Sequence, residues 1–60
     1  MAKAKFNTTA EAASVMSRLH AQGLVDAWND QRVFGKVYAR FLRNGRWYDV
    51  TVSDLTAWGL

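Results

Sequence analysis

Residues 36–53 read KVYARFLRNGRWYDVTVS, with Asn44-Gly45 at the centre of the stretch. Asn-Gly between two strand-like runs is the strongest short-range signal of a β-hairpin, because a type I′ turn needs positive φ at both turn positions. A two-residue loop then determines how the two strands pair. The predicted pairs are Arg43–Arg46, Leu42–Trp47, Phe41–Tyr48, Arg40–Asp49, Ala39–Val50, Tyr38–Thr51, Val37–Val52 and Lys36–Ser53.

This register separates the side chains of the hairpin into two sets. One face is apolar and is predicted to lie in the core, and it contains Val37, Ala39, Phe41, Tyr48, Val50 and Val52. The other face is mixed, and it contains Lys36, Tyr38, Arg40, Leu42, Trp47, Asp49, Thr51 and Ser53. A slip of one residue would mix the two sets, which supports the register. Arg40 opposite Asp49 adds a cross-strand attraction.

A helix is predicted over residues 9–22. The sequence Thr8-Thr9-Ala10-Glu11 is typical of a capping box, in which Thr8 caps the helix and Glu11 bonds back from the third helical position. An apolar stripe at helical spacing follows, and it contains Ala12, Val15, Met16 and Leu19. Gly23 is expected to end the helix in the left-handed conformation.

The segment between the helix and the hairpin allows two interpretations. Residues 24–28 fit a strand that turns at Asn29-Asp30-Gln31 into Val33. In that case the core gains Leu24, Trp28 and Val33. Residues 24–28 also have apolar side chains at helical spacing, so a second helical turn is the alternative. Gly35 inside a strand pattern indicates a bulge in preference to a close approach of the backbone.

Both ends of the chain carry shorter patterns. Residues 2–6 alternate small or apolar side chains with lysine, which fits either a short edge strand or a frayed terminus. Ser53-Asp54 is a candidate cap for a last helical turn that packs Leu55 and Trp58 against the sheet. The sequence therefore predicts one α+β domain over residues 1–60, with one helix on a three- to four-stranded antiparallel sheet in the order (β)-α-β-β-β.

The composition excludes several kinds of site. The 60 residues include no cysteine, so disulfides and cysteine zinc sites are excluded. The single histidine, His20, cannot form a metal cage with the scattered carboxylates and is expected to face solvent on the helix. No apolar run approaches the length of a membrane span, and the start MAKAK is not followed by a signal-peptide core. We therefore expect a cytoplasmic protein that does not contact membranes and is complete from its initiator Met.

No catalytic constellation is predicted either. A triad could be assembled from Ser14 or Ser17 with His20 and Asp26, but neither serine lies in a nucleophile elbow and no oxyanion loop is visible. The four glycines are isolated, so there is no phosphate-binding loop. We expect no catalytic residue, no cofactor and no bound metal, and hence a protein that acts by binding.

The mixed face of the hairpin is the candidate binding surface. Residues 31–48 include five basic residues and no acid, and Tyr38, Leu42 and Trp47 lie among them. Trp, Tyr and Arg are enriched in binding hot spots, and an exposed apolar patch on so small a protein indicates an interface. The predicted partner-binding residues are Lys36, Tyr38, Arg40, Leu42, Arg43, Arg46 and Trp47. The alternative is a second small core, in which Trp58 folds over Leu42 and Trp47.

We expect a non-enzymatic protein-binding module, an inhibitor or adaptor that docks through this hairpin on a host protein or nucleoprotein complex. In size and architecture the chain is similar to small accessory proteins of phages and mobile elements, which often block a CRISPR effector or another nuclease. No residue motif carries this similarity. One alternative is a nucleic-acid-binding protein, in which the arginines neutralise phosphates while Trp47 and Tyr38 stack on bases. The other is a structural protein that forms homodimers through the same face.

Overall fold

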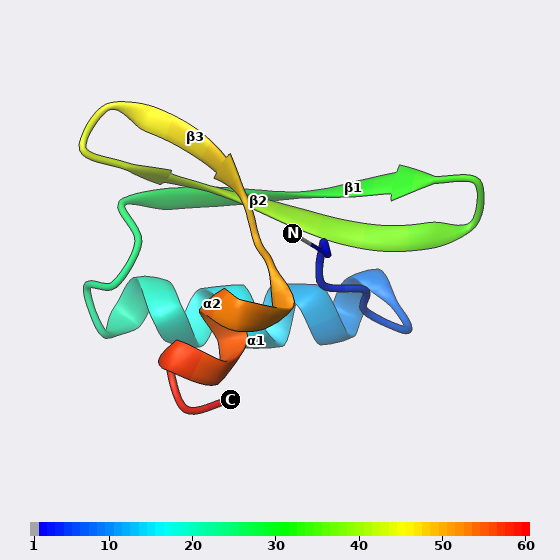
Figure 1. Ribbon diagram of the computed structural model, residues 1–60, viewed down its shortest axis with the longest axis horizontal. Helices are drawn as coiled ribbons and strands as arrows, with labels where there is room; N and C mark the ends of the chain where they lie inside the picture. The colour runs from blue at the N-terminus through cyan, green and yellow to red at the C-terminus, as the bar shows by residue number, and fades with distance from the viewer. Residues whose placement is uncertain (1) are drawn as a thin grey trace.

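The computed structural model describes residues 2–60, so Met1, the expected initiator residue, lies outside the described residues. The elements follow the order α1, β1, β2, β3 and α2 (Figure 1). Their bounds are Thr9–Ala21 for α1, Ala27–Val33 for β1, Lys36–Arg43 for β2, Arg46–Asp49 for β3 and Val52–Ala57 for α2. The strands form one antiparallel sheet in the order β1-β2-β3, which confirms the predicted α+β class and its hairpin.

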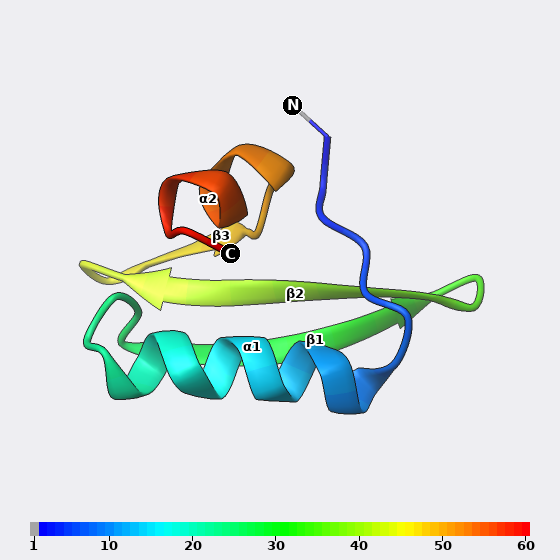
Figure 2. The ribbon, with the colours of Figure 1, turned by 90° about the horizontal axis from the view of Figure 1, so that it is seen from below.

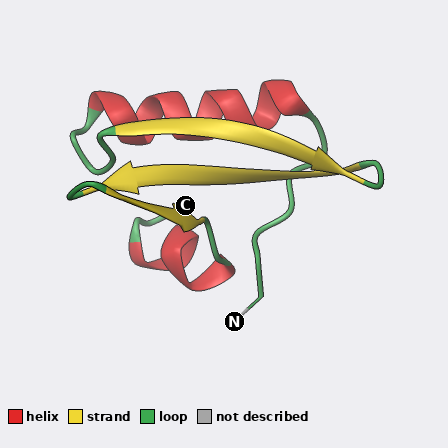
Figure 3. Ribbon diagram, turned by 90° about the horizontal axis from the view of Figure 1, so that it is seen from above, coloured by secondary structure: helices red, strands yellow, loops and turns green. Residues whose placement is uncertain are grey.

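The elements form two layers. Both helices lie on the same side of the sheet, below it in Figure 1, and the view from below in Figure 2 shows α1 in front of β1. In the view from above, Figure 3, the strands lie in front of both helices and no helix covers the face turned to the viewer. The sheet therefore has one face against the helices and one face free of them.

The core lies between the sheet and the helices. Its buried side chains are Ala4, Phe6, Ala12, Met16, Leu19, Val25, Val37, Ala39, Phe41 and Val50. The predicted apolar stripe of α1 supplies three of them, and Val15 of that stripe is half-buried. Trp58, beyond α2, closes the core with its ring edge-on to Phe41, at 5.3 Å between ring centroids. Tyr48 was expected in this core but is 44% exposed, because it stacks on Phe41 only along one ring face at the edge of the sheet.

Helix α1 begins at the predicted Thr9 and ends at Ala21, one residue before the predicted end. The Thr8 hydroxyl accepts a hydrogen bond from the Glu11 amide at 3.0 Å, and the Glu11 carboxylate accepts one from the Asn7 amide at 2.9 Å. The return bond of the box therefore reaches one residue earlier than the predicted Thr8. At the other end Gly23 has φ 75°, and the Leu24 amide donates to the Leu19 carbonyl at 3.0 Å. This is a Schellman motif, which ends the helix at Ala21.

The register of β2 and β3 is the predicted one from the Arg43–Arg46 pair to the Arg40–Asp49 pair. The Val50 amide also donates to the Ala39 carbonyl at 3.0 Å, as a fifth pair requires. The last three predicted pairs, Tyr38–Thr51, Val37–Val52 and Lys36–Ser53, do not form, because α2 begins at Val52.

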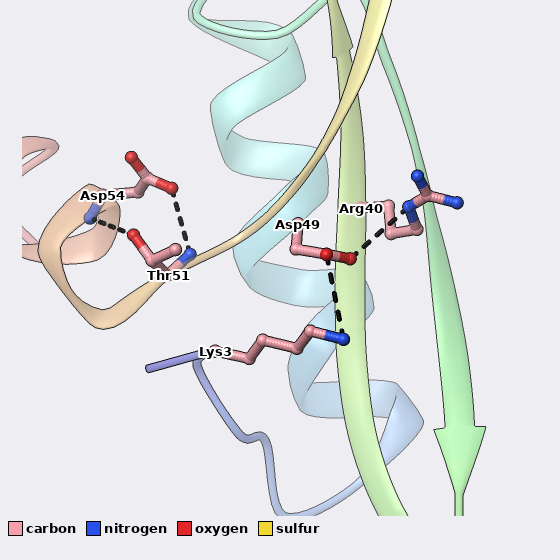
Figure 4. A network of polar contacts seen from close by, with 5 residues as sticks. All are labelled: Lys3, Arg40, Asp49, Thr51 and Asp54. Carbon is pink, nitrogen blue, oxygen red and sulfur yellow. Dashed lines mark hydrogen bonds and ion pairs between the residues drawn. The ribbon is translucent and has the colours of Figure 1, made fainter. Parts of the chain in front are cut away.

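The chain leaves the sheet because Thr51, and not the predicted Ser53, caps α2. The Thr51 hydroxyl accepts from the Asp54 amide at 3.1 Å, and the Asp54 carboxylate accepts from the Thr51 amide at 3.0 Å (Figure 4). This capping box gives the backbone of residues 51–54 local partners that compete with strand pairing. Val52 consequently lies 54% exposed on α2 instead of in the predicted core.

The N-terminal segment takes the place beside β2 that β3 leaves free. The Phe6 amide donates to the Val37 carbonyl and the Ala4 amide to the Val50 carbonyl, both at 2.9 Å. Ala4 and Phe6 are buried whereas the residues next to them are exposed, as the predicted alternation requires. The segment makes two isolated bridges, to Thr51 and to Val37, and no continuous strand.

Strand β1 differs from its prediction. It runs straight through residues 29–31, where a turn was predicted, and pairs with β2 from Ala27–Leu42 to Val33–Lys36. The turn is Phe34-Gly35, with φ 51° and 77°, so the predicted bulge at Gly35 and the helical alternative for residues 24–28 are both wrong. Polar side chains at 29–31 are compatible with this strand because they lie exposed at the edge of the sheet. Leu24 and Trp28 pack against the core as predicted, whereas Val33 is 44% exposed.

Candidate binding face

The pleat of the sheet determines which side chains point away from the helices. In β2 the residues Val37, Ala39 and Phe41 are buried against the helices, and side chains alternate along a strand. The intervening residues of β2 and their partners on β1 and β3 therefore form the free side, which we name the open face. It contains Ala27, Asn29, Gln31, Val33, Lys36, Tyr38, Arg40, Leu42, Trp47 and Asp49.

Five of the seven predicted binding residues lie on the open face: Lys36, Tyr38, Arg40, Leu42 and Trp47. The other two, Arg43 and Arg46, form the pair next to the turn and alternate with Leu42 and Trp47. The structure therefore does not bring them onto the open face. They are exposed at the tip of the hairpin, on the side of the sheet that faces the helices.

An apolar spot marks one end of the open face. Leu42 and Trp47 are directly opposite each other on β2 and β3, and Trp47 is 44% exposed while Leu42 is half-buried. Trp58 lies on the other side of the sheet, against Phe41. The second core, in which Trp58 would fold over Leu42 and Trp47, is therefore wrong.

A chain of charges crosses the middle of the open face. The Asp49 carboxylate lies between two cations, with Lys3 Nζ at 3.8 Å and Arg40 Nε at 3.5 Å (Figure 4). The same Lys3 Nζ lies 5.8 Å from the centroid of the Tyr38 ring, within cation–π range. Arg40 Nε is shielded from solvent and makes an ion pair with Asp49 without hydrogen-bond geometry. The one carboxylate of the face is thus neutralised on both sides, and the Tyr38 ring has a lysine over it.

The open face, together with the Lys3 side chain that contacts it, has a positive balance. Three cations, Lys3, Lys36 and Arg40, and one carboxylate, Asp49, give it a formal charge of +2.

Within residues 2–60 there is no pocket and no group of three or more His, Cys, Asp or Glu side chains that could hold a metal ion. No helix in this described part of the chain has the length and apolar character needed to cross a membrane.

Two contributions to the face were missed in the sequence. Asn29, Gln31 and Val33 of β1 belong to it, and they would have been found if Phe34-Gly35 had been taken as the turn of a second hairpin. The sequence places Lys3 only in the alternating segment of residues 2–6, because nothing local in the sequence pairs that segment with Thr51.

Comparisons of this chain with protein-family models, with curated proteins and with solved structures found no match.

Proposed function

We propose that this protein is a non-enzymatic binding module whose open face docks on an acidic surface of a partner protein. One observation carries the proposal: the face that no helix covers combines the exposed Trp47 beside Leu42 with a formal charge of +2, counting the contacting Lys3. Aromatic anchors surrounded by charged side chains are the usual composition of binding hot spots. An inhibitor or adaptor of a host protein or nucleoprotein complex acts in this way, by covering or joining surfaces.

Nucleic-acid binding is the second candidate, and the positive balance of the open face favours it. Trp47 has an exposed ring that could stack on a base. Two features disfavour nucleic-acid binding. Lys3 lies over the Tyr38 ring, where a base would have to stack, and the Asp49 carboxylate would repel a phosphate backbone. A protein surface accommodates both features more easily, because carboxylates and cations alternate in protein interfaces.

Self-association through the open face is disfavoured by the same charge. Two copies placed face to face would bring two surfaces of formal charge +2 together. Like charges juxtaposed across an interface oppose association. A partner of opposite charge avoids this cost.

The test is a comparison of baits in a lysate of the cells that encode the protein. Wild type and Val52→Ala, which truncates a side chain 54% exposed on the helix side, should retain the same partner. Trp47→Ala and Lys36→Glu should lose it, because each alters the open face only. Equal retention by all four baits would show that the open face is not the docking surface.

The nucleic-acid candidate has its own measurement. Tryptophan fluorescence is titrated with mixed-sequence 20-nucleotide DNA and RNA, single-stranded and duplex, at low and at near-physiological salt. If Lys3, Lys36 and Arg40 all neutralise duplex phosphates, log K falls by about 3 per tenfold rise in salt. Such a slope would replace the protein partner by a nucleic acid.

A further inference from the structure

Phe34 is the most exposed large apolar side chain of the described residues. It is 99% exposed, and it occupies the turn between β1 and β2, at the opposite end of β2 from Asn44-Gly45 (Figure 1). Burial of this side chain therefore contributes nothing to the stability of the fold.

The backbone at Phe34 is also unfavourable for phenylalanine. Its φ is 51°, in the left-handed region that bulky residues seldom adopt. The turn at the other end of β2 has the same geometry, with φ 54° at Asn44, and there the residue is the one that type I′ turns prefer. The two turns can therefore be compared directly. The same backbone geometry holds asparagine at one end of β2 and phenylalanine at the other.

The surroundings of Phe34 indicate the chemistry of what would contact it. Val33 beside it is 44% exposed on the open face, so the two side chains form one apolar tip. Arg32 and Lys36 lie next to this tip on opposite sides of the sheet, because Arg32 pairs with the buried Val37 and Lys36 pairs with Val33. Both are exposed, and residues 31–39 include no acid. The tip therefore offers an aromatic anchor and an aliphatic neighbour between two cations.

We propose that Phe34 inserts into an apolar pocket with an acidic rim on the same partner protein that the open face contacts. The inference rests on the proposed function and adds a second, separate anchor to it. An aromatic side chain in a pocket, with charged groups at its rim, is the arrangement of a hot spot. A protein pocket also uses Val33, whereas stacking on a base would use only the ring of Phe34.

The experiment replaces Phe34 with the residue of the other turn. Phe34→Asn should raise the midpoint of thermal unfolding, by on the order of 5 °C, because it relieves the unfavourable turn without removing a buried contact. The same variant should bind the partner retained by wild type, once purified, at least about 30-fold more weakly. Phe34→Leu keeps an apolar side chain at the same φ, and its affinity should stay within about tenfold of wild type.

Each other outcome overturns a distinct statement. If no protein distinguishes wild type from Trp47→Ala, the proposed function fails and the Phe34 pocket fails with it. If the partner is lost by Trp47→Ala but binds Phe34→Asn as tightly as wild type, only the Phe34 pocket is refuted. A lower unfolding midpoint for Phe34→Asn would make Phe34 a structural residue. A loss confined to binding of the 20-nucleotide probes would replace the pocket by a nucleobase.

Discussion

Trp47 and Phe41 are aromatic residues on neighbouring strands that should respond very differently to truncation. Phe41 is 6% exposed, stacks on Tyr48 at 5.4 Å and meets the edge of Trp58 at 5.3 Å, so Phe41→Ala leaves a cavity. Such a cavity costs about 3–5 kcal/mol. A domain of 60 residues has a free energy of unfolding of roughly 3–9 kcal/mol, so this variant should be largely unfolded or close to it.

Trp47→Ala should cost far less, because Trp47 is 44% exposed and its partner across the strands is Leu42. A cross-strand pair contributes about 0.2–1 kcal/mol. For a domain of this size that lowers the midpoint of thermal unfolding by at most about 8 °C.

Thermal and urea denaturation, both followed by far-ultraviolet circular dichroism, measure the two costs. The helix signal of Trp47→Ala should match that of wild type at 25 °C while partner binding is lost. A loss of stability equal to that of Phe41→Ala would place Trp47 in a core and would refute the open face as a binding surface.

Three further substitutions test other contacts. Thr51→Ala removes the hydroxyl that accepts from the Asp54 amide at 3.1 Å, so the free energy of unfolding in urea should fall by about 1 kcal/mol. Thr51→Ser should recover most of this loss, and no recovery would contradict the role of the cap. Arg43→Glu replaces one of two arginines that lie directly opposite each other, and it should stabilise the hairpin by about 0.2–1 kcal/mol. This gain should shrink in high salt, and a gain independent of salt would not be electrostatic. Asp49→Asn removes the carboxylate shared by Lys3 and Arg40 and should lower stability by less than about 1 kcal/mol. Amide hydrogen exchange of Ala4, which bonds to Val50, should become faster; an unchanged rate would mean that the ion pair does not hold the N-terminal segment.

The parts of the fold that could be predicted are those with local causes. Asn44-Gly45 determines both the turn and the register around it, because a two-residue loop leaves one way to pair the strands. Thr8 and Gly23 likewise mark the ends of α1 within a few residues of the bonds they make.

The predictions were wrong at three places, the Phe34-Gly35 turn, the end of β3 and Tyr48, where another interaction outweighed the local sequence pattern. Phe34 conceals the second type I′ turn, since the rule for such turns expects asparagine, aspartate or glycine before Gly35. The alternation of residues 50–53 continues the strand pattern, yet the capping box of Thr51 and Asp54 ends it. Alternation along β3 places Tyr48 on the same side of the sheet as the core. Alternation does not show how far the helices extend over that side, and Tyr48 is left exposed.

The candidate site was predictable to the same extent. Alternation assigns Tyr38, Arg40, Leu42 and Trp47 to one face from sequence alone. Whether that face is free depends on where Trp58 packs, which is a tertiary property that no local pattern encodes. The charge of the face is tertiary as well, because Lys3 reaches Asp49 only through the bridge that the N-terminal segment makes to Thr51.

Trp47 and Phe34 lie near opposite ends of β2, and this separation constrains any single partner that contacts both. The eight residues of β2 extend about 26 Å at roughly 3.3 Å per residue, nearly the full 29 Å length of the molecule. A partner that reaches both side chains must follow the whole open face and so meet the cations between them. Because sites more than about 10 Å apart usually contribute additively, the two anchors need not be coupled through the fold. Strand β2 thus sets the separation of the two aromatic side chains, with Lys36 and Arg40 of the open face between them.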